Sequence, residues 1–184
     1  YYNGKVFQAV HRAFSDLSPV TCFARDPDGR IWAGTNTGGL LKLSKESGVL
    51  TKYRLRNQES VISFDFLEDG DLLIGTNAGL LHCRLKESRE IDIVRIVKEI
   101  PESKVTGIVK LKSQKGLYIA TENDGVYKLT YEKGQFNISA LNSDSGFALS
   151  GIQSIYEDSW SDLWLASFGN GLIKMDYSAS GTLV

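Results

Sequence analysis

The 184-residue sequence has few of the residues that mark several common protein classes. Its two cysteines, Cys22 and Cys83, are too few for a disulfide framework or a zinc cluster, and we expect both to be buried free thiols. No segment approaches the roughly 18 consecutive apolar residues of a membrane span. The first residues also lack the basic and then apolar order of a signal peptide. We therefore expect no membrane contact by this segment itself.

An excess of charge of one sign is missing too. The 21 Lys and Arg residues are balanced by 22 Asp and Glu, for a formal net charge of -1. Nucleic-acid binding usually requires a basic excess, so we expect no nucleic acid partner. The two histidines, His11 and His82, lie near no nucleophile motif, and we expect each to be a satisfied surface or inter-strand residue. The sequence predicts no catalytic residue, no metal site and no cofactor, and we expect that this chain is not an enzyme.

Helical periodicity is the last feature that the sequence lacks. Apolar and polar residues alternate instead, as in residues 90–97, and this alternation is typical of strands. Eighteen glycines and three prolines indicate many tight turns between short strands. The composition and the pattern together predict an all-β fold.

One short pattern occurs four times along the chain. Each copy has an apolar residue, a bulky residue, and a small residue followed by a hydroxyl, and a short turn then leads to a glycine before another apolar residue. The hydroxyls are spaced by 41, 45 and 46 residues, which is the length of one four-stranded propeller blade. The repeat positions are Trp32, Gly34, Thr35 and Gly39; Leu73, Gly75, Thr76 and Gly79; Tyr118, Thr121 and Gly125; and Trp164, Ser167 and Gly171.

The repeat predicts a single β-propeller over residues 1–184, with about four blades of four antiparallel strands. The bulky residue would pack between blades, the small residue would lie where sheets approach closely, and we expect Phe23, Phe64 and Phe66 in the core. The blades are expected at about 16–55, 58–97, 102–141 and 147–184, after an outer strand within 1–14. The expected strands are 20–25, 30–35, 39–44 and 49–55; 61–66, 71–76, 80–85 and 91–97; 105–110, 117–121, 125–130 and 135–141; and 152–157, 163–167 and 171–176.

The predicted units do not coincide with the two ends of the sequence. Residues 4–10 resemble an outer strand, and the fourth repeat stops where its own outer strand should begin. Either the first strand completes the last blade of a four-bladed ring, or the chain is an incomplete fragment of a larger propeller of about seven blades. We favour the fragment. An open arc leaves blade faces and strand edges unpaired, which favours a homodimer or contact with other blades or domains of a parent protein.

The first repeat is specific enough to resemble a known family. Residues 26–40 read Asp-Pro-Asp-Gly-Arg-Ile-Trp-Ala-Gly-Thr-Asn-Thr-Gly-Gly-Leu, with Lys-Tyr-Arg at 52–54, and they resemble the two-component regulator propeller repeat. The fourth copy is similar, whereas the second and third have Leu73 and Tyr118 in place of the tryptophan. The resemblance implies an extracytoplasmic sensor region of a bacterial hybrid two-component system histidine kinase, in which two propellers and a small β-sandwich precede a membrane span, a kinase and a response-regulator output.

The same resemblance sets the expected function. Many such sensors respond to oligosaccharides, so we expect a non-catalytic periplasmic or extracytoplasmic sensing module whose parent is anchored in the inner membrane and carries the kinase. The alternative is a propeller scaffold for protein–protein contact in a surface or secretion-system component, where the same repeats occur.

Propeller geometry limits where a ligand could bind. Loops between the second and third strands, and between one blade and the next, would emerge on one face, and the remaining turns on the other. Polar loop residues can hydrogen-bond sugar hydroxyls, and an exposed aromatic ring can stack on a sugar. The candidate ligand-binding residues are Asn36, Thr37, Arg56, Asn77, Asn123, Asp124, Phe168 and Asn170.

Overall fold

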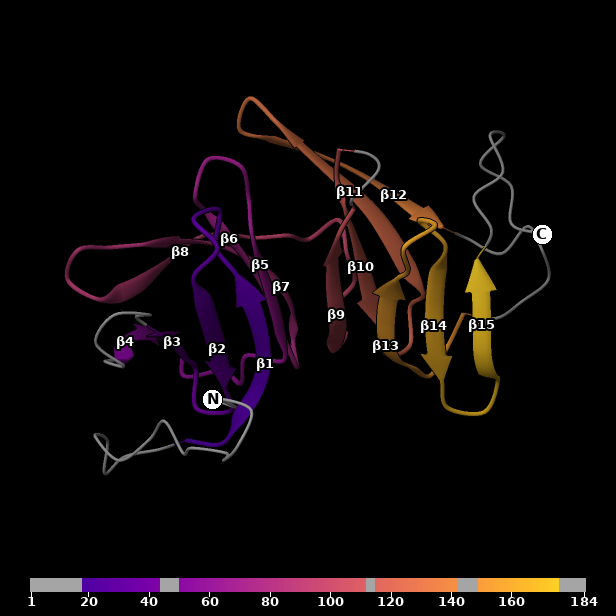
Figure 1. Cartoon of the computed structure of the whole chain (residues 1–184), viewed down its shortest axis with the longest axis horizontal. Coiled ribbons are helices and arrows are strands. Elements are labelled where there is room, and N and C mark those ends of the chain that lie inside the picture. The colour runs from indigo at the N-terminus through magenta and orange to yellow at the C-terminus, as the bar shows by residue number, and fades with distance from the viewer. Residues whose placement is uncertain (1–17, 44–49, 112–114, 142–148, 176–184) are drawn as a thin grey trace, which may run out of the picture.

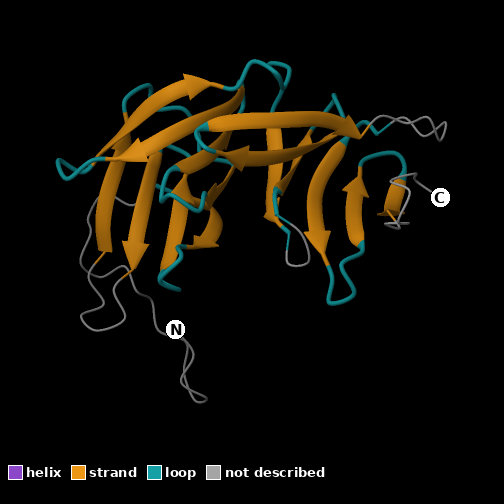
Figure 2. Ribbon diagram, turned by 90° about the horizontal axis from the view of Figure 1, so that it is seen from above, coloured by secondary structure: helices purple, strands orange, loops and turns teal. Residues whose placement is uncertain are grey.

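The computed structural model describes residues 18–43, 50–111, 115–141 and 149–175. These residues form fifteen strands and no helix, so none of them belongs to a helix long and apolar enough to cross a membrane. Four small antiparallel blades follow one another along the chain and stand side by side in an arc, and the first two are joined into one eight-stranded sheet (Figure 1; Figure 2). The all-β propeller architecture predicted from the repeat is confirmed, as a partial propeller.

The strands of each blade are called a, b, c and d in chain order. Blade 1 comprises β1 (Val20–Arg25), β2 (Ile31–Thr35), β3 (Gly39–Leu43) and β4 (Leu50–Leu55). Blade 2 comprises β5 (Ser63–Phe66), β6 (Leu72–Thr76), β7 (Gly79–Leu85) and β8 (Glu90–Ile96). Blade 3 comprises β9 (Val105–Lys110), β10 (Leu117–Thr121), β11 (Val126–Glu132) and β12 (Gln135–Leu141). Blade 4 comprises β13 (Ile152–Glu157), β14 (Leu163–Ser167) and β15 (Gly171–Met175).

Most strands lie within two residues of their expected bounds, and β5 is shorter for a physical reason. The Val61 amide donates to the Thr35 carbonyl of blade 1 at 3.0 Å, so the start of the expected strand ties two blades together instead of extending the ladder. The outer strand expected within 1–14, the end of blade 4 after residue 175, and His11 lie outside the described residues.

Three apolar cores hold the arc together, one between each pair of neighbouring blades. Trp32 of blade 1 packs against Phe66 of blade 2, with ring centroids 5.3 Å apart, and against Tyr53 of its own blade at 5.2 Å. Leu73 occupies the same place between blades 2 and 3, and Tyr118 between blades 3 and 4. The bulky repeat residue therefore faces the next blade along the chain.

The small residue of the repeat allows the close approach that the propeller needs. A Cβ added at Gly34 would lie 2.8 Å from a methyl group of Val61 in blade 2, and one at Gly75 would lie 2.7 Å from a methyl group of Val105 in blade 3. Cys83 in β7 is a fully buried free thiol, as expected. Cys22 in β1 is also a free thiol but is only half-buried, so its expected burial is wrong. Burial, with Asp71 and Asp92 nearby, raises the pKa of the Cys83 thiol to about 12.

An aspartate fixes the tryptophan in the a–b turn of blades 1 and 4. The Trp32 indole donates to Asp26 at 3.0 Å, and the Trp164 indole donates to Asp158 at 2.8 Å. The Arg30 amide and guanidinium also donate to Asp26, at 2.8 and 2.7 Å. Burial acts to raise the pKa of Asp26, but these hydrogen bonds outweigh it and hold the pKa below its ordinary value.

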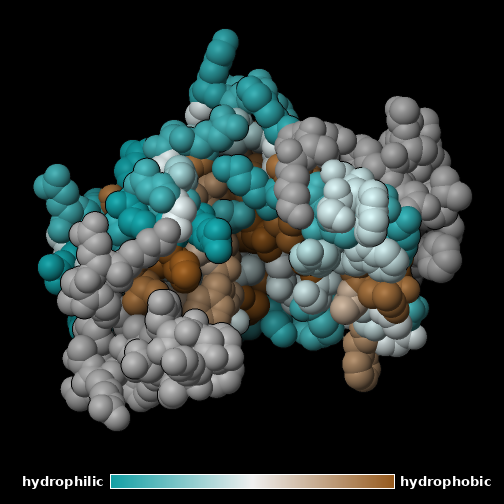
Figure 3. Space-filling view, viewed as in Figure 1, coloured by the Kyte–Doolittle hydropathy of each residue, from teal (hydrophilic) through white to brown (hydrophobic). Residues whose placement is uncertain are grey.

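One of the three phenylalanines expected in the core lies instead on an end face of the arc. Phe64 and Phe66 are in the core as expected, but Phe23 is 71% exposed, so its expected burial is wrong. Phe64, at the same strand position in blade 2, packs against blade 1, whereas the described residues include no blade before blade 1 to cover Phe23. Trp164 on the last blade is half-buried for the corresponding reason. Apolar surface is visible at both ends of the arc (Figure 3).

The outer strands of blades 1 and 2 meet in a short parallel joint. Arg54 and Leu55 of β4 pair with Glu90 and Ile91 of β8. This joint brings the c–d turn of blade 2 beside the loop that follows β4. Turns between strands c and d and loops between blades were expected on opposite faces, and that expectation is wrong here. Strand twist accounts for the difference, because it turns outer strands away from the direction of the inner ones.

Candidate ligand-binding cleft

The b–c turns carry most of the predicted ligand-binding residues, and in three blades a threonine hydroxyl holds the turn. Thr35 Oγ1 accepts from the Gly39 amide at 2.9 Å and donates to the Gly39 carbonyl at 3.1 Å. Thr76 and Thr121 donate to the corresponding glycine carbonyl at 3.1 and 2.9 Å. In blade 4 the hydroxyl of Ser167 instead donates to the Ser150 carbonyl at 2.8 Å.

The predicted ligand-binding residues are all exposed, and they are distributed over four blades. The structure brings two of them, Thr37 and Arg56, into one cleft. Six do not line that cleft: Asn36, Asn77, Asn123, Asp124, Phe168 and Asn170. Their proposed role in binding stays a prediction.

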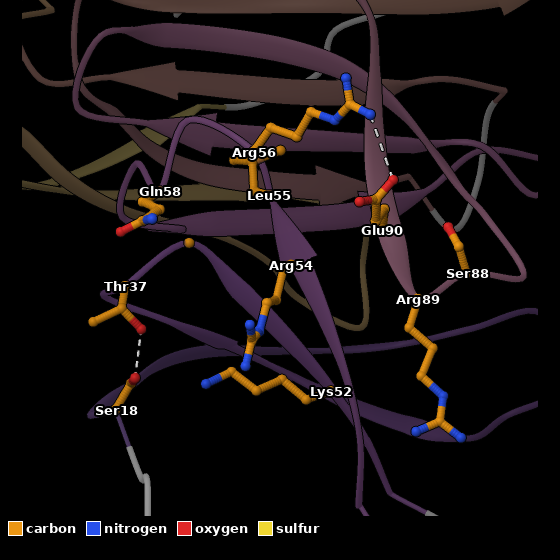
Figure 4. A pocket seen from close by; sticks show the side chains of 11 residues that line it. Ser18, Thr37, Lys52, Arg54, Leu55, Arg56, Gln58, Ser88, Arg89 and Glu90 are labelled. Carbon is orange, nitrogen blue, oxygen red and sulfur yellow. Dashed lines mark hydrogen bonds and ion pairs between the residues drawn. The ribbon is translucent and has the colours of Figure 1, made fainter.

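The cleft has a volume of about 840 Å³ and lies at the joint between β4 and β8 (Figure 4). Residues from the b–c turn of blade 1, from β4 and the loop after it, and from the c–d turn of blade 2 form its walls. The lining residues are Ser18, Thr37, Gly38, Lys52, Arg54, Leu55, Arg56, Gln58, Ser88, Arg89 and Glu90.

Backbone hydrogen bonds position the walls of the cleft. The Arg54 amide donates to the Arg89 carbonyl at 3.1 Å, and the Leu55 amide donates to the Gly38 carbonyl at 2.7 Å. Gly38 has a φ of +73°, and a Cβ there would lie 2.7 Å from the Gln58 backbone. Glycine is therefore required where the b–c turn packs against the loop after β4.

Positive charge dominates the cleft. Lys52 and Arg54 share one side of β4 because successive side chains along a strand alternate, while Tyr53 and Leu55 face the core on the other side. Arg56 follows in the turn after β4 and extends toward Glu90 (Figure 4). Arg89 adds a fourth cation from blade 2. Glu90 is the single carboxylate among the lining residues, and it lies 3.5 Å from the Arg56 guanidinium.

Of the four cations in the cleft, only Arg56 was predicted from the sequence, whereas Lys52, Arg54 and Arg89 were not. A signal was present, because Lys52 and Arg54 occupy alternate positions of the predicted strand 49–55 and Arg56 follows directly after it. Arg89 could not have been found in this way, since its place in the cleft depends on the β4–β8 joint between two repeats.

A second polar cluster lies between blades 2 and 3, in which Asp71 and His82 are buried and Arg84 is exposed. Asp71 accepts two hydrogen bonds of 2.7 Å from Arg84, and its Oδ2 lies 3.0 Å from His82 Nε2. The rings of Tyr131 and Phe136 from blade 3 pack on His82, with centroids 5.6 and 5.1 Å away. His82 is thus a satisfied inter-strand residue, as expected. Within the described ranges no group of three or more His, Cys, Asp or Glu side chains could hold a metal ion.

Comparison with known proteins supports the repeat type. Residues 15–37 match the model of the two component regulator propeller family. This match confirms the resemblance seen in the first repeat, over strand a and strand b of blade 1. A search of curated proteins finds no match.

Solved structures share the fold. The extracellular domain of a proposed hybrid two component system from B. thetaiotaomicron is similar with a TM-score of 0.64 at 24% identity, over 93% of this chain and 22% of that chain. Virginiamycin B lyase from Staphylococcus aureus gives 0.63 at 20% identity, over 90% and 54% of the two chains. A gluconolactonase from Xanthomonas campestris gives 0.59 at 14% identity, over 90% and 60%.

The chain therefore spans 22% to 60% of the length of these three structures. The likenesses show the β-propeller fold, which the extracellular domain of a two component system and two enzymes share. Fold and sequence together define a partial β-propeller that contains a two-component regulator propeller repeat.

Proposed function

We propose that this chain is a non-catalytic sensing module of an extracytoplasmic bacterial sensor, and that an oligosaccharide is its signal. The observation that carries the proposal is the match of residues 15–37 to the two component regulator propeller family. The likeness to the extracellular domain of a proposed hybrid two component system gives further support. The receiving kinase would lie in a parent protein, outside this chain.

The β4–β8 joint offers a way to convert binding into a structural signal. Blades 1 and 2 share a large apolar core, but their outer strands pair at two positions, Arg54 with Glu90 and Leu55 with Ile91. A ligand in the cleft would touch both blades and favour the paired state of this joint. Because a ligand shifts an equilibrium by its difference in affinity for the two states, binding across the joint would bias the relative position of the blades.

The chemistry of the cleft supports a non-catalytic role. Acid–base catalysis usually needs a histidine or a pair of carboxyl groups within reach of the substrate. The cleft lining offers cations, hydroxyls and an amide, and its carboxylate, Glu90, is paired with Arg56. These groups suit hydrogen bonding and charge pairing.

A panel of neutral and acidic oligosaccharides tests the proposal on the full 184-residue chain. We expect at least one to raise the melting temperature in a saturable way, because a ligand that binds the folded state stabilises it. Calorimetry would give the stoichiometry, and chromatography should recover the sugar unchanged. Conversion of the sugar would contradict a non-catalytic role. A panel without any binder, combined with capture of a defined surface or secretion component, would favour the scaffold alternative.

A further inference from the structure

We propose that the cleft between β4 and β8 binds an acidic oligosaccharide whose carboxylate or sulfate groups recur along the sugar chain. This inference rests on the proposed function and names the ligand class of that same site. The site is the cleft of about 840 Å³ between blades 1 and 2.

The local charge of the cleft favours an anionic ligand. The whole chain is close to neutral, with a formal net charge of -1, yet the cleft is lined by four cations and one carboxylate. Two of the cations, Lys52 and Arg54, lie on one side of β4, and Arg56 follows in the turn after it. Like charges at such spacing repel each other, and a recess concentrates their field. An anionic ligand removes this repulsion, whereas a neutral sugar does not.

The separation of the charged side chains in the cleft favours an extended ligand over a small ion. Lys52 and Arg54 extend together toward Thr37 and Ser18, whereas Arg56 turns toward Glu90 (Figure 4). Arg89 lies on the other side of β4 in this view. Because these groups do not converge on one point, a single phosphate or sulfate could not contact them all. A chain with repeated anionic groups could contact them in turn, and the hydroxyls of Ser18 and Thr37 could bind its neutral positions.

The backbone at Arg89 has a φ of +65°. This left-handed region suits glycine, and the c–d turn of blade 3 has Gly134 there with a φ of +81°. A bulky residue in this region strains the backbone, and such strain is typical of functional sites. Gln58, with a φ of +53°, also lines the cleft. Lys133 and Ser161, in turns outside the cleft, share this conformation, so the backbone sets the direction of the Arg89 and Gln58 side chains but does not by itself mark a ligand site.

A matched pair of sugars tests the charge dependence directly. Hexagalacturonate and its fully methyl-esterified form share one skeleton and differ in their carboxylates. Calorimetry on the full chain should give binding of the acid and at least about tenfold weaker binding of the ester, since charge-assisted hydrogen bonds are lost. Affinity for the acid should fall as sodium chloride rises from about 0.05 to 0.5 M, because salt screens the exposed cations. A sulfated hexasaccharide serves as the second acidic probe.

Substitutions test whether this cleft is the site. Arg54→Gln and Arg89→Gly should each weaken hexagalacturonate binding by about fivefold or more, by loss of one charged contact. Arg89→Gly should also raise the melting temperature of the free chain, because glycine relieves the left-handed strain. Ser161→Gly, at a φ of +68° in blade 4, should raise stability in the same way and leave binding unchanged. Arg25→Gln removes one exposed cation outside the cleft and should also leave binding unchanged.

Several outcomes would overturn the proposal. Equal affinity for the acid and the ester would show that charge is not recognised. Equal affinity for hexagalacturonate and for a hexathymidylate would indicate general polyanion or nucleic acid binding. Full competition against hexagalacturonate by inorganic sulfate at millimolar concentration would indicate a single-anion site. Unchanged binding by both cleft variants would place the sugar elsewhere. A neutral sugar that binds while both acidic probes fail would overturn this inference and leave the proposed function standing.

Discussion

The aspartate of the a–b turn links the repeat sequence to the packing of single residues. Asp26 pairs with Trp32, and Asp158 pairs with Trp164. In blade 2 both positions are leucine, at Leu67 and Leu73, and both side chains are buried in the core between blades 2 and 3. The two positions therefore differ together between repeats of the same chain, with an Asp–Trp pair in blades 1 and 4 and a Leu–Leu pair in blade 2. A buried indole N–H without an acceptor is costly, and an apolar pair avoids that cost.

Replacement of this aspartate should destabilise the two blades to different extents. Asp26→Ala leaves the buried Trp32 indole without its acceptor, and we expect a loss of about 2–3 kcal/mol in the free energy of unfolding. Asp158→Ala should cost less, because Trp164 is half-buried and water can replace the carboxylate. Urea denaturation of both variants measures the difference. Equal losses would contradict a dependence on burial.

The depressed pKa of Asp26 predicts how stability changes with pH. A carboxyl whose pKa is lower in the folded state adds stability above its unfolded pKa of about 3.9, and that stability is lost as the pH falls through the folded pKa. Asp71, whose pKa is lowered by Arg84 and His82 against the effect of burial, contributes with the same sign. We expect Asp26→Asn to flatten the loss of stability between about pH 5 and 2.

Asp65 is the matched control for this experiment, because burial raises its pKa. Its ionised form is disfavoured in the folded state, so Asp65→Asn should increase stability at neutral pH and have little effect in acid. Denaturation curves from pH 7 down to about 2 would show the two opposite signs. The same pH profile for both variants would contradict the assignment.

At the scale of elements, the hydroxyl that ends strand b controls the following hairpin. Thr121 Oγ1 accepts from the Asp124 amide at 3.0 Å and donates to the Gly125 carbonyl at 2.9 Å, and its side chain is buried. Valine has the same shape but no hydroxyl, so we expect Thr121→Val to lose about 1–2 kcal/mol. Thr130→Val, on the neighbouring strand β11, should change stability by less than about 0.5 kcal/mol. A shifted urea midpoint with an unchanged slope would identify the effect as a loss of stability.

Strands and blades were predictable because they depend on local patterns. Alternation and the turn glycines locate most strands to within two residues, and the repeat spacing gives the blade architecture. The cleft was predictable in part. Thr37 and Arg56 lie on loops that the repeat identifies, but Arg89 joins them through the pairing of β4 with β8, which no single repeat encodes. The exposure of Phe23 likewise depends on what lies beside blade 1, and alternation along β1 carries no information about that.

At the scale of the whole molecule, the same repeat position has opposite surroundings in the middle and at the ends of the arc. Phe64 is 3% exposed in blade 2, whereas Phe23 is 71% exposed in blade 1. Leu40 and Leu80 are fully buried against the next blade, whereas Leu172 of blade 4 is 68% exposed. Both end faces therefore have the composition of a blade-to-blade contact. A further blade of the same type, or a second copy of the chain, fits such a face.

We therefore expect the chain to associate in solution through these faces, and the repeat supplies a matched pair of variants. Phe23→Ser removes an exposed ring from one end face and should shift the chain toward monomer with little change in stability. Phe64→Ser makes the same change inside the arc and should cost about 3–5 kcal/mol through the cavity that it leaves. Sedimentation velocity over a range of concentrations measures the association, and urea denaturation measures the stability. A wild-type chain that stays monomeric at every concentration would contradict self-association, and a Phe23→Ser variant as unstable as Phe64→Ser would show that the first face is covered within the chain itself.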